Sequence, residues 1–313
     1  MQSGQLDHWS DYWAAGRLTS LPDDFAANYE GEIAAFWTAQ FTDVPEGGRM
    51  LDLCTGNGPI PLLAAADFAA RGRVVELVAI DAAGIDPAAM AARHPDLASL
   101  IPRIQFLGNS PIEQHELPPE HFDLVTSQYG IEYADWHAAA RQVAHTLKPG
   151  GRLAIICHCA SRDMLVNNLA LARDFERLSG IGILGAIGRF LTGTLSFARL
   201  QRAVKAARPE LAAAYRAGGT DMLQFVQVGL ERIESMDKGT IRRQRLELRD
   251  FIRYLELARA RCEDLLRVNQ ALEASPEWYR AFEAAGLDFL ESGEIRVEGE
   301  RLMGRSYRFE KPA

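Results

Sequence analysis

The chain has 313 residues, of which 48% are hydrophobic and 24% are charged, so it can bury one large core or a core with an insertion. Its net charge of −8 argues against a surface built chiefly for nucleic acid. Four cysteines in a chain of this length indicate a reducing compartment and not a disulfide scaffold.

The first ten residues are polar and acidic, unlike a signal peptide. The longest uncharged apolar run, residues 178–188, is too short to span a bilayer. We therefore expect a soluble, cytoplasmic protein without a transmembrane segment.

Residues 1–47 are rich in aromatic side chains and are predicted to be helical. From Asp24 to Gln40 the apolar positions recur with a helical period. These rings could simply pack the helices onto the domain behind them. Alternatively, the segment forms a lid, with Tyr12, Trp13 and Tyr29 lining a pocket for an organic substrate.

A glycine turn follows a short apolar run at Met50–Gly58, and the alanine-rich stretch from Pro61 to Ala70 is predicted to be a helix. Strand, tight turn and helix in this order form nucleotide pockets in doubly wound α/β domains, because unpaired helix N–H groups face the ligand. Two glycines alone are a weak signal, since they often mark only a turn.

The next predicted strand, Val74–Ile80, ends in Asp81, about twenty residues beyond the glycines. An α/β dinucleotide site places a carboxylate at this point to bind a ribose. Asp86 competes for the role, but Asp86-Pro87 resembles a helix N-cap with proline in the first turn. We favour Asp81 and leave Asp86 as the alternative.

Three further strands are predicted at 104–107, 122–127 and 152–157, with a helix at 136–147 before the last. Alternating strands and helices predict a mostly parallel sheet with right-handed crossovers. Ligands bind at the carboxyl ends of such strands, and Gly56, Asp81, Asn109, Gln128 and His158 all fall there.

Several motifs in this order resemble those of the class I S-adenosylmethionine-dependent methyltransferases, the small-molecule, ubiquinone-biosynthesis type included. They are the run 51–58, the strand ending in Asp81, the loop 108–110, the strand 122–125 and the run 147–151. The resemblance resumes at a helix over 281–287, which precedes two strand-like runs, 289–297 and 301–309. It implies a Rossmann-like sheet with an antiparallel C-terminal strand.

The resemblance also implies that S-adenosyl-L-methionine is the cofactor and that site residues carry over by position. Asp52 and the turn would lie along its methionyl part, Asp81 at the ribose, and residues 109–110 and 127–129 at the adenine and sulfonium ends. Cys54 departs from the family, which usually has glycine there, and we expect slightly altered packing. The cofactor-binding candidates are Asp52, Thr55, Gly56, Asn57, Gly58, Asp81, Asn109, Ser110, Ser127, Gln128 and Tyr129.

A sulfonium methyl is already activated, so a general base is needed only if the nucleophile arrives protonated. His158 is the best-placed candidate for that base, with Glu132 as a weaker one; Tyr133 is a candidate both as base and for contact with the substrate. Cys157 and Cys159 flank His158, but alternate residues of a strand point to opposite faces, so we predict no metal site.

Residues 161–275 form a large helical insertion in the core that is built from 48–160 and 276–313. Helical periods at 222–233 and 248–266 predict two long amphipathic helices. We expect the insertion to be a cap over the pocket or a dimerisation element, which makes a homodimer possible.

The predicted function is methyl transfer to a small organic acceptor, at a hydroxyl or carboxyl oxygen. One alternative is an NAD(P)-dependent oxidoreductase, although Pro61 stands where a third small residue is wanted. The other is a cofactor-binding scaffold of the same fold that does not methylate.

Overall fold

The computed structural model describes residues 6–21, 25–159, 162–297 and 301–313. The chain divides into two compact units: Met1–Met164 with Val268–Ala313, and Leu165–Arg267. The expected role of the insertion, as a cap or a dimerisation element, stays a prediction.

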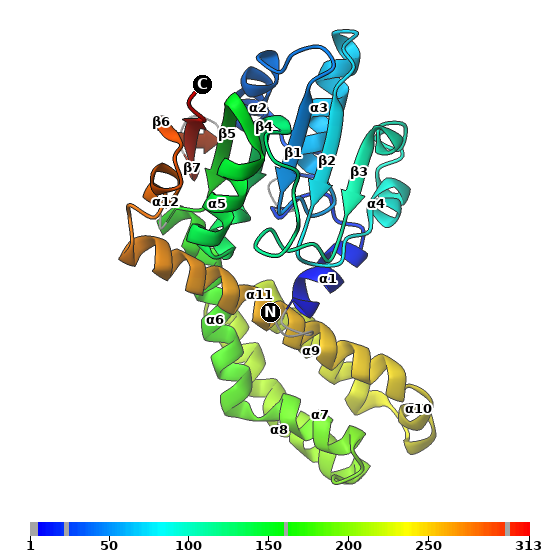
Figure 1. The fold of residues 1–313 in the computed structure, drawn as a ribbon. Coiled ribbons are helices and arrows are strands. Elements are labelled where there is room, and N and C mark those ends of the chain that lie inside the picture. The colour runs from blue at the N-terminus through cyan, green and yellow to red at the C-terminus, as the bar shows by residue number, and fades with distance from the viewer. Residues whose placement is uncertain (1–5, 22–24, 160–161, 298–300) are drawn as a thin grey trace. The chain divides into compact units, whose positions relative to one another are not determined.

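A seven-stranded sheet forms the first unit, in the order β3-β2-β1-β4-β5-β7-β6 (Figure 1). The pairs from β3 to β5 are parallel, and β7 is antiparallel to both of its neighbours. This confirms the predicted Rossmann-like sheet with its antiparallel C-terminal strand. The strands are β1 Arg49–Leu53, β2 Glu76–Ile80, β3 Ile104–Leu107, β4 Phe122–Gln128, β5 Leu147–Cys157, β6 Asp288–Val297 and β7 Arg301–Glu310.

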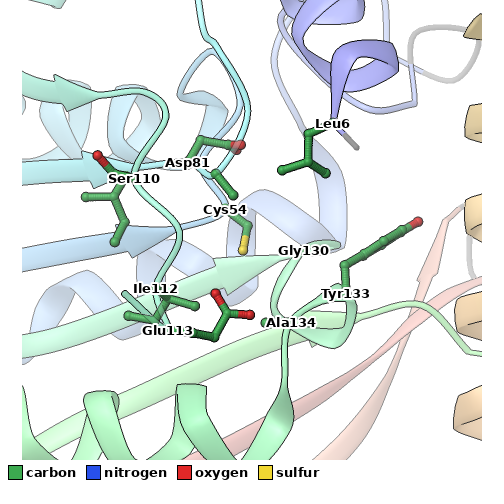
Figure 2. A pocket seen from close by; sticks show the side chains of 11 residues that line it. Leu6, Cys54, Asp81, Ser110, Ile112, Glu113, Gly130, Tyr133 and Ala134 are labelled. Carbon is green, nitrogen blue, oxygen red and sulfur yellow. The ribbon is translucent and has the colours of Figure 1, made fainter. Parts of the chain in front are cut away.

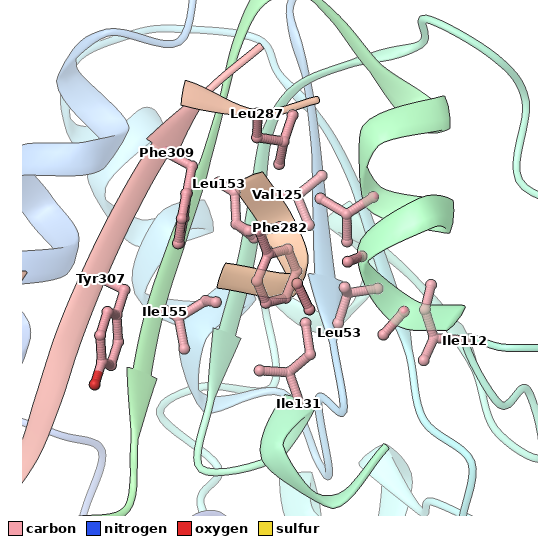
Figure 3. Close-up of a cluster of buried hydrophobic side chains, with 14 of the residues drawn as sticks. Leu53, Ile112, Val125, Ile131, Leu153, Ile155, Phe282, Leu287, Tyr307 and Phe309 are labelled. Atoms are coloured by element: carbon pink, nitrogen blue, oxygen red, sulfur yellow. The ribbon is translucent and has the colours of Figure 1, made fainter. Parts of the chain in front are cut away.

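Helices cover both faces of this sheet, and each face has its own apolar core. Helices α2 (Gly31–Thr42) and α3 (Pro59–Ala70) pack on one face through Trp37, Phe41 and Ile60, all at most 1% exposed. Helices α5 (Trp136–Thr146) and α12 (Arg280–Ala284) cover the other, where Phe282 and Phe309 lie close together (Figure 3). Burial on both faces explains why the inner strands are almost uniformly apolar.

Shorter helices complete the first unit. They are α1 Asp7–Ala14, α4 Pro87–Arg93, and the 3-10 turns η1 Ile101–Arg103 and η2 Ile131–Tyr133. The turn η1 leads into the amino end of β3, whereas η2 follows the carboxyl end of β4 and can contribute side chains to a site there.

The predicted helix from Asp24 to Gln40 begins later than expected. Asp24 lies outside the described residues, residues 25–30 are not helical, and α2 starts at Gly31, whose φ is +60°. Phe25 and Tyr29 are nevertheless buried, with their rings 5.1 Å apart. An irregular segment thus buries two aromatic residues whose spacing of four imitates a helix.

The second unit is helical and has a core of its own, built from residues such as Leu200, Val226 and Leu255. A Cβ on Gly188 would meet nothing within 4 Å, and one on Gly185 would meet only the end of the Arg189 side chain. The glycines between residues 181 and 193 therefore do not mediate close helix packing. The helices are α6 Arg162–Ile181, α7 Ile183–Leu191, α8 Phe197–Arg216, α9 Asp221–Ser235, α10 Lys238–Arg243 and α11 Arg245–Ala274. In the part of the chain that the structure describes, no helix has the length and apolarity that a bilayer span requires.

Candidate active site

The glycine turn after β1 has two positions that a side chain could not occupy. Gly56 and Gly58 both have positive φ, at +54° and +86°. A Cβ on Gly56 would come within 2.5 Å of the Trp13 ring, and one on Gly58 within 2.5 Å of the Phe106 ring. Gly58 is also the N-cap of α3, so the turn delivers the chain directly into the helix with its amide groups at the edge of the sheet.

Asp81 closes the turn from the neighbouring strand. Its two carboxylate oxygens accept hydrogen bonds from the backbone N–H of Gly56 and of Ala83, each at 2.7 Å. Burial raises the pKa of Asp81 to about 6, although these two bonds oppose the shift. Each oxygen keeps a second lone pair, with which it can accept a bond from a hydroxyl group.

Asp86, the alternative ribose partner, has a different role in this structure. Its side chain accepts a hydrogen bond of 2.8 Å from the N–H of Ala89, which makes it the N-cap of α4. Asp86 does not line the pocket beside Asp81.

A pocket opens at the carboxyl ends of the strands, beside Asp81 (Figure 2). The Asp81 and Glu113 carboxylates and the Cys54 sulfur lie around it. The residues that line it are Leu6, Cys54, Ile80, Asp81, Ala82, Ser110, Ile112, Glu113, Gly130, Tyr133 and Ala134, and none of these is Lys or Arg. The lining is therefore apolar with a negative side, which suits a neutral or cationic ligand.

Three of the predicted cofactor residues, Asn57, Ser127 and Tyr129, bond backbone groups through their side chains. The amide nitrogen of Asn57 donates to the carbonyl oxygens of Trp13 and Arg17, and its oxygen accepts from the N–H of Asp86. Ser127 donates to the carbonyl of Leu53 and accepts from the N–H of Ile131. Tyr129 donates a hydrogen bond to the Met303 carbonyl. Asn109 is exposed and has a φ of +56°, and its neighbour Ser110 is half-buried and lines the pocket.

Asp52 and Gln128 lie deeper, between β1, β4 and α2. The Asp52 carboxylate accepts a 2.6 Å hydrogen bond from Thr126 and is 1% exposed, and burial raises its pKa to about 7. Thr55, the remaining predicted residue of the turn, is 4% exposed, and its hydroxyl oxygen has no hydrogen-bond partner among the described residues. Gln128 accepts from the Trp37 indole, and its buried Nε2 has no hydrogen-bond partner among the described residues.

The predicted substrate residues do not all reach the pocket. Tyr133 lines it, and its ring meets that of Trp9 edge-on at 5.9 Å. Tyr12 donates a hydrogen bond to the Thr19 carbonyl, and Trp13 packs on Gly56. Tyr29 is 4% exposed, and burial raises its pKa to about 12. Their roles as substrate contacts stay predictions.

His158 forms a dyad with Glu132 just beyond the end of β5. Its ring Nδ1 lies 2.7 Å from Glu132 Oε1, and its backbone N–H donates to the same oxygen at 2.8 Å. Both side chains are buried, at 6% and 3% exposed, and the His158 ring stands 5.9 Å from that of the pocket residue Tyr133. Bonding at Nδ1 leaves Nε2 as the nitrogen that can exchange a proton.

The sequence did not single out Glu113, Ile112 or Gly130 as pocket residues. Glu113 follows β3 in a loop without periodicity and also accepts a hydrogen bond from the N–H of Asp135. Such loop residues carry no pattern that could have revealed them. Within the described ranges, no group of three His, Cys, Asp or Glu side chains is placed to hold a metal ion.

The chain matches the methyltransferase domain family over residues 25–191, which is more than half of its length. It belongs to the class I S-adenosylmethionine-dependent methyltransferases. This membership favours the methyltransferase prediction over the nicotinamide-dependent alternative.

Two curated relatives and one solved structure illustrate the likeness. The 2-phytyl-1,4-naphtoquinone methyltransferase of Thermosynechococcus vestitus is 34% identical over 115 residues, 36% of this chain and 48% of that protein. The ubiquinone/menaquinone biosynthesis C-methyltransferase UbiE of Shewanella frigidimarina is 26% identical over 156 residues, 49% and 60% of the two chains. The geranyl diphosphate C-methyltransferase of Streptomyces coelicolor A3(2) aligns with a TM-score of 0.38 and 13% identity over 50% of this chain and 66% of its own. The chain spans about half the length of the curated relatives it matches.

The methyltransferase's site fits the family's cofactor, whose sulfonium and ammonium groups are positive. The Asp81 and Glu113 carboxylates give the pocket negative charge, which favours these positive groups. Gln128 Nε2 is a buried donor without a partner among the described residues and is suited to a carboxylate. At Gly56 the absence of a side chain leaves room for the Trp13 ring, which covers the turn.

Proposed function

We propose that this protein transfers a methyl group from S-adenosylmethionine to a hydroxyl oxygen of a small organic acceptor. The observation that carries the proposal is the buried dyad of His158 and Glu132 beside the pocket, because a base is required only when the nucleophile arrives with a proton. When bound, the cofactor supplies an activated methyl group. The chain's own residues must then align the acceptor, exclude water and remove one proton.

His158 takes the proton in this proposal, through Nε2. Glu132 fixes the ring through Nδ1 and stabilises the imidazolium that forms. Glu132 Oε2 has no hydrogen-bond partner among the described residues, so it can also accept a bond from the acceptor. Asp81 binds the ribose hydroxyls in this proposal, and Asn109, next to the pocket residue Ser110, faces the adenine amino group.

An acceptor with an aromatic ring suits the side chains around the dyad. The Tyr129 and Tyr133 rings lie 4.8 and 5.9 Å from the His158 ring, and offset or edge-on packing of rings at such distances is favourable. One relative is named a 2-phytyl-1,4-naphtoquinone methyltransferase, and the other is named for ubiquinone and menaquinone biosynthesis. Quinols are therefore the first acceptors to assay, and a carboxylate acceptor is disfavoured by the negative pocket.

Carbon is the second candidate for the acceptor atom, because one relative is named a C-methyltransferase. The same base would then remove the hydroxyl proton of a quinol, and the ring carbon beside that oxygen would accept the methyl group. Loss of the proton from that carbon, with return of a proton to the oxygen, would restore the aromatic quinol. Mass spectrometry and NMR of the product distinguish an ether from a ring methyl group.

The test begins with calorimetric titration of the purified chain with S-adenosylmethionine, S-adenosylhomocysteine and NADPH. Binding of the first two and not of the third, followed by methylation of a quinol panel, supports the proposal. Cofactor binding without turnover on any acceptor would favour the scaffold alternative, and binding of NADPH alone would contradict the cofactor assignment.

We also propose a cytoplasmic location and a homodimer formed through the helical insertion. Cys54, Cys157 and Cys262 are not in disulfide bonds in the described part of the chain, which suits a reducing compartment. Sedimentation equilibrium of the full chain measures the oligomeric state, and a monomer at all concentrations would exclude the dimer.

A further inference from the structure

The helical unit and the rest of the chain carry opposite charge. Residues 165–267 hold 18 of the chain's 34 Lys and Arg but only 12 of its 42 Asp and Glu, so this unit has a net charge of about +6 and the remainder about −14. Such an asymmetry within an acidic protein indicates a surface that meets an anionic partner.

The positive charge is densest where α10 leads into α11. Residues 238–253 hold six cations, Lys238, Arg242, Arg243, Arg245, Arg249 and Arg253, against the two acids Glu247 and Asp250. Glu247 already faces Arg232 at 3.9 Å. Lys238, Arg242 and Arg249 are exposed and make no ion pair within the described part of the chain.

Exposed apolar side chains stand among these cations. Leu246 is 68% exposed and lies on the same face of α11 as Arg249 and Arg253, which follow it by three and seven residues. Burial of Leu248, Ile252 and Leu255 fixes the opposite face toward the core of the unit. Leu246 and the arginines therefore point to solvent together.

An aromatic cluster extends this face onto α9. Phe225 and Tyr254 are 46% and 43% exposed, with ring centroids 5.2 Å apart, and Phe251 lies 5.5 Å from Phe225. Gly229 makes the arrangement possible, since a Cβ there would come within 2.7 Å of the Phe251 ring. Val228, 52% exposed, adjoins the cluster on α9.

We propose that this α9–α11 face, comprising Phe225, Val228, Lys238, Arg242, Arg243, Leu246, Arg249, Arg253 and Tyr254, docks the protein on a bilayer that contains anionic phospholipid. The cations attract the anionic headgroups, while Leu246, Phe225 and Tyr254 enter the interface between headgroups and acyl chains, where aromatic rings are favoured. A surface for nucleic acid would use the arginines but give no role to the exposed apolar side chains. This inference goes beyond the proposed function and does not rest on it.

Vesicle flotation of the full chain tests the proposal with phosphatidylcholine alone and with added phosphatidylglycerol. We expect binding only in the presence of phosphatidylglycerol, with loss at high salt. Arg242→Gln with Arg249→Gln should lower the partition coefficient by about 30-fold, from the usual contribution of each cation at an anionic surface. Leu246→Gln with Tyr254→Gln should also weaken binding, but leave its salt dependence intact.

Arg199→Gln with Arg216→Gln is the matched control, because both arginines are exposed on α8 and the net charge changes equally. This control should keep vesicle binding, and circular dichroism should show every variant folded. Equal loss in the control would contradict a specific face. Binding of the protein to duplex DNA but not to vesicles would also contradict the proposal. So would a protein that does not bind vesicles but forms a dimer that the Arg242→Gln, Arg249→Gln variant abolishes.

Discussion

Cys54 and Gly130 touch across the ends of β1 and β4, and each determines what the other can be. Cys54 has a φ of +56°, in the left-handed region where its family usually has glycine, and a Cβ on Gly130 would overlap the Cβ of Cys54. The unexpected side chain in the turn is thus accommodated by the absence of one at Gly130. The altered packing expected at Cys54 is located in this contact.

This contact predicts a coupled pair of substitutions. Gly130→Ala should lower the free energy of unfolding by about 1–3 kcal/mol, because the new methyl group has no space. Cys54→Gly alone should change it by less than about 1 kcal/mol, since relief of the left-handed strain is offset by a more flexible unfolded chain. Urea denaturation measures both.

In the double variant Cys54→Gly, Gly130→Ala most of the loss should be recovered, with a coupling energy of about 1–3 kcal/mol. Gly188→Ala is the control, because nothing lies within 4 Å of a Cβ at that position, and it should not destabilise the chain. Additive effects of the two substitutions would show that the contact does not determine the pair.

The dyad predicts a graded loss of turnover. His158→Ala should lower kcat by about 10²–10⁴-fold, the usual contribution of a general base, while the affinity for S-adenosylmethionine is kept. Glu132→Gln should give a smaller loss, because glutamine can still accept the bond from the His158 N–H but cannot stabilise an imidazolium. Single-turnover kinetics with a quinol acceptor measures both.

Measuring both kcat and the melting temperature of the Glu132→Gln variant distinguishes a role in positioning His158 from a role in folding. A merely structural Glu132 would change the melting temperature of the Glu132→Gln variant and not kcat in folded protein. Full turnover by folded His158→Ala would remove His158 from the mechanism.

Asp81 and Asp86 make a matched pair for the ribose assignment. Asp81→Ala should weaken cofactor binding by about 10- to 100-fold, because bonds to a charged carboxylate are lost and the Gly56 amide is released. Asp86→Ala should leave the affinity near that of the wild type and lower stability by about 1 kcal/mol through loss of the α4 cap. Calorimetry and thermal melts measure the two effects, and the opposite result would assign the ribose to Asp86.

The sheet was predictable because its signals are local. Apolar runs that end in glycine turns or in Asp81 place the inner strands, and β1 to β4 begin within two residues of the predicted positions. The exception is β5, which begins at Leu147, five residues before its predicted start. The start of α2 was not predictable, because Phe25 and Tyr29 have helical spacing but are buried by an irregular segment.

The site was harder to predict because its contacts join distant segments. A motif match groups Asn57 with the cofactor loop, but it cannot show that the Asn57 amide binds the carbonyls of Trp13 and Arg17, which lie 44 and 40 residues away. The pairing of Glu132 with His158 likewise depends on the adjacency of β4 and β5 in the sheet. Chemistry-bearing positions were found, but their partners were not.

The raised pKa of Asp52 predicts how the free energy of unfolding depends on pH. Its pKa is raised by burial from 3.8 to about 7, so the folded state binds the proton more tightly than the unfolded state does. The free energy of unfolding should therefore fall as the pH rises from about 4 to about 7, by about 4 kcal/mol at most from this residue. Asp81, raised to about 6, acts in the same direction over a narrower range.

Asp52→Asn removes this titration while its side-chain oxygen can still accept the Thr126 hydrogen bond. Between pH 5 and pH 8, about three decades of proton concentration, the melting temperature of the variant should decline much less than that of the wild type. At pH 8 the variant should be more stable than the wild type. Asp96→Asn, at an exposed carboxylate, should keep the wild-type slope. An unchanged slope in Asp52→Asn would contradict a raised pKa, because a carboxyl group with an ordinary or lowered pKa is ionised in both the folded and the unfolded state over this pH range.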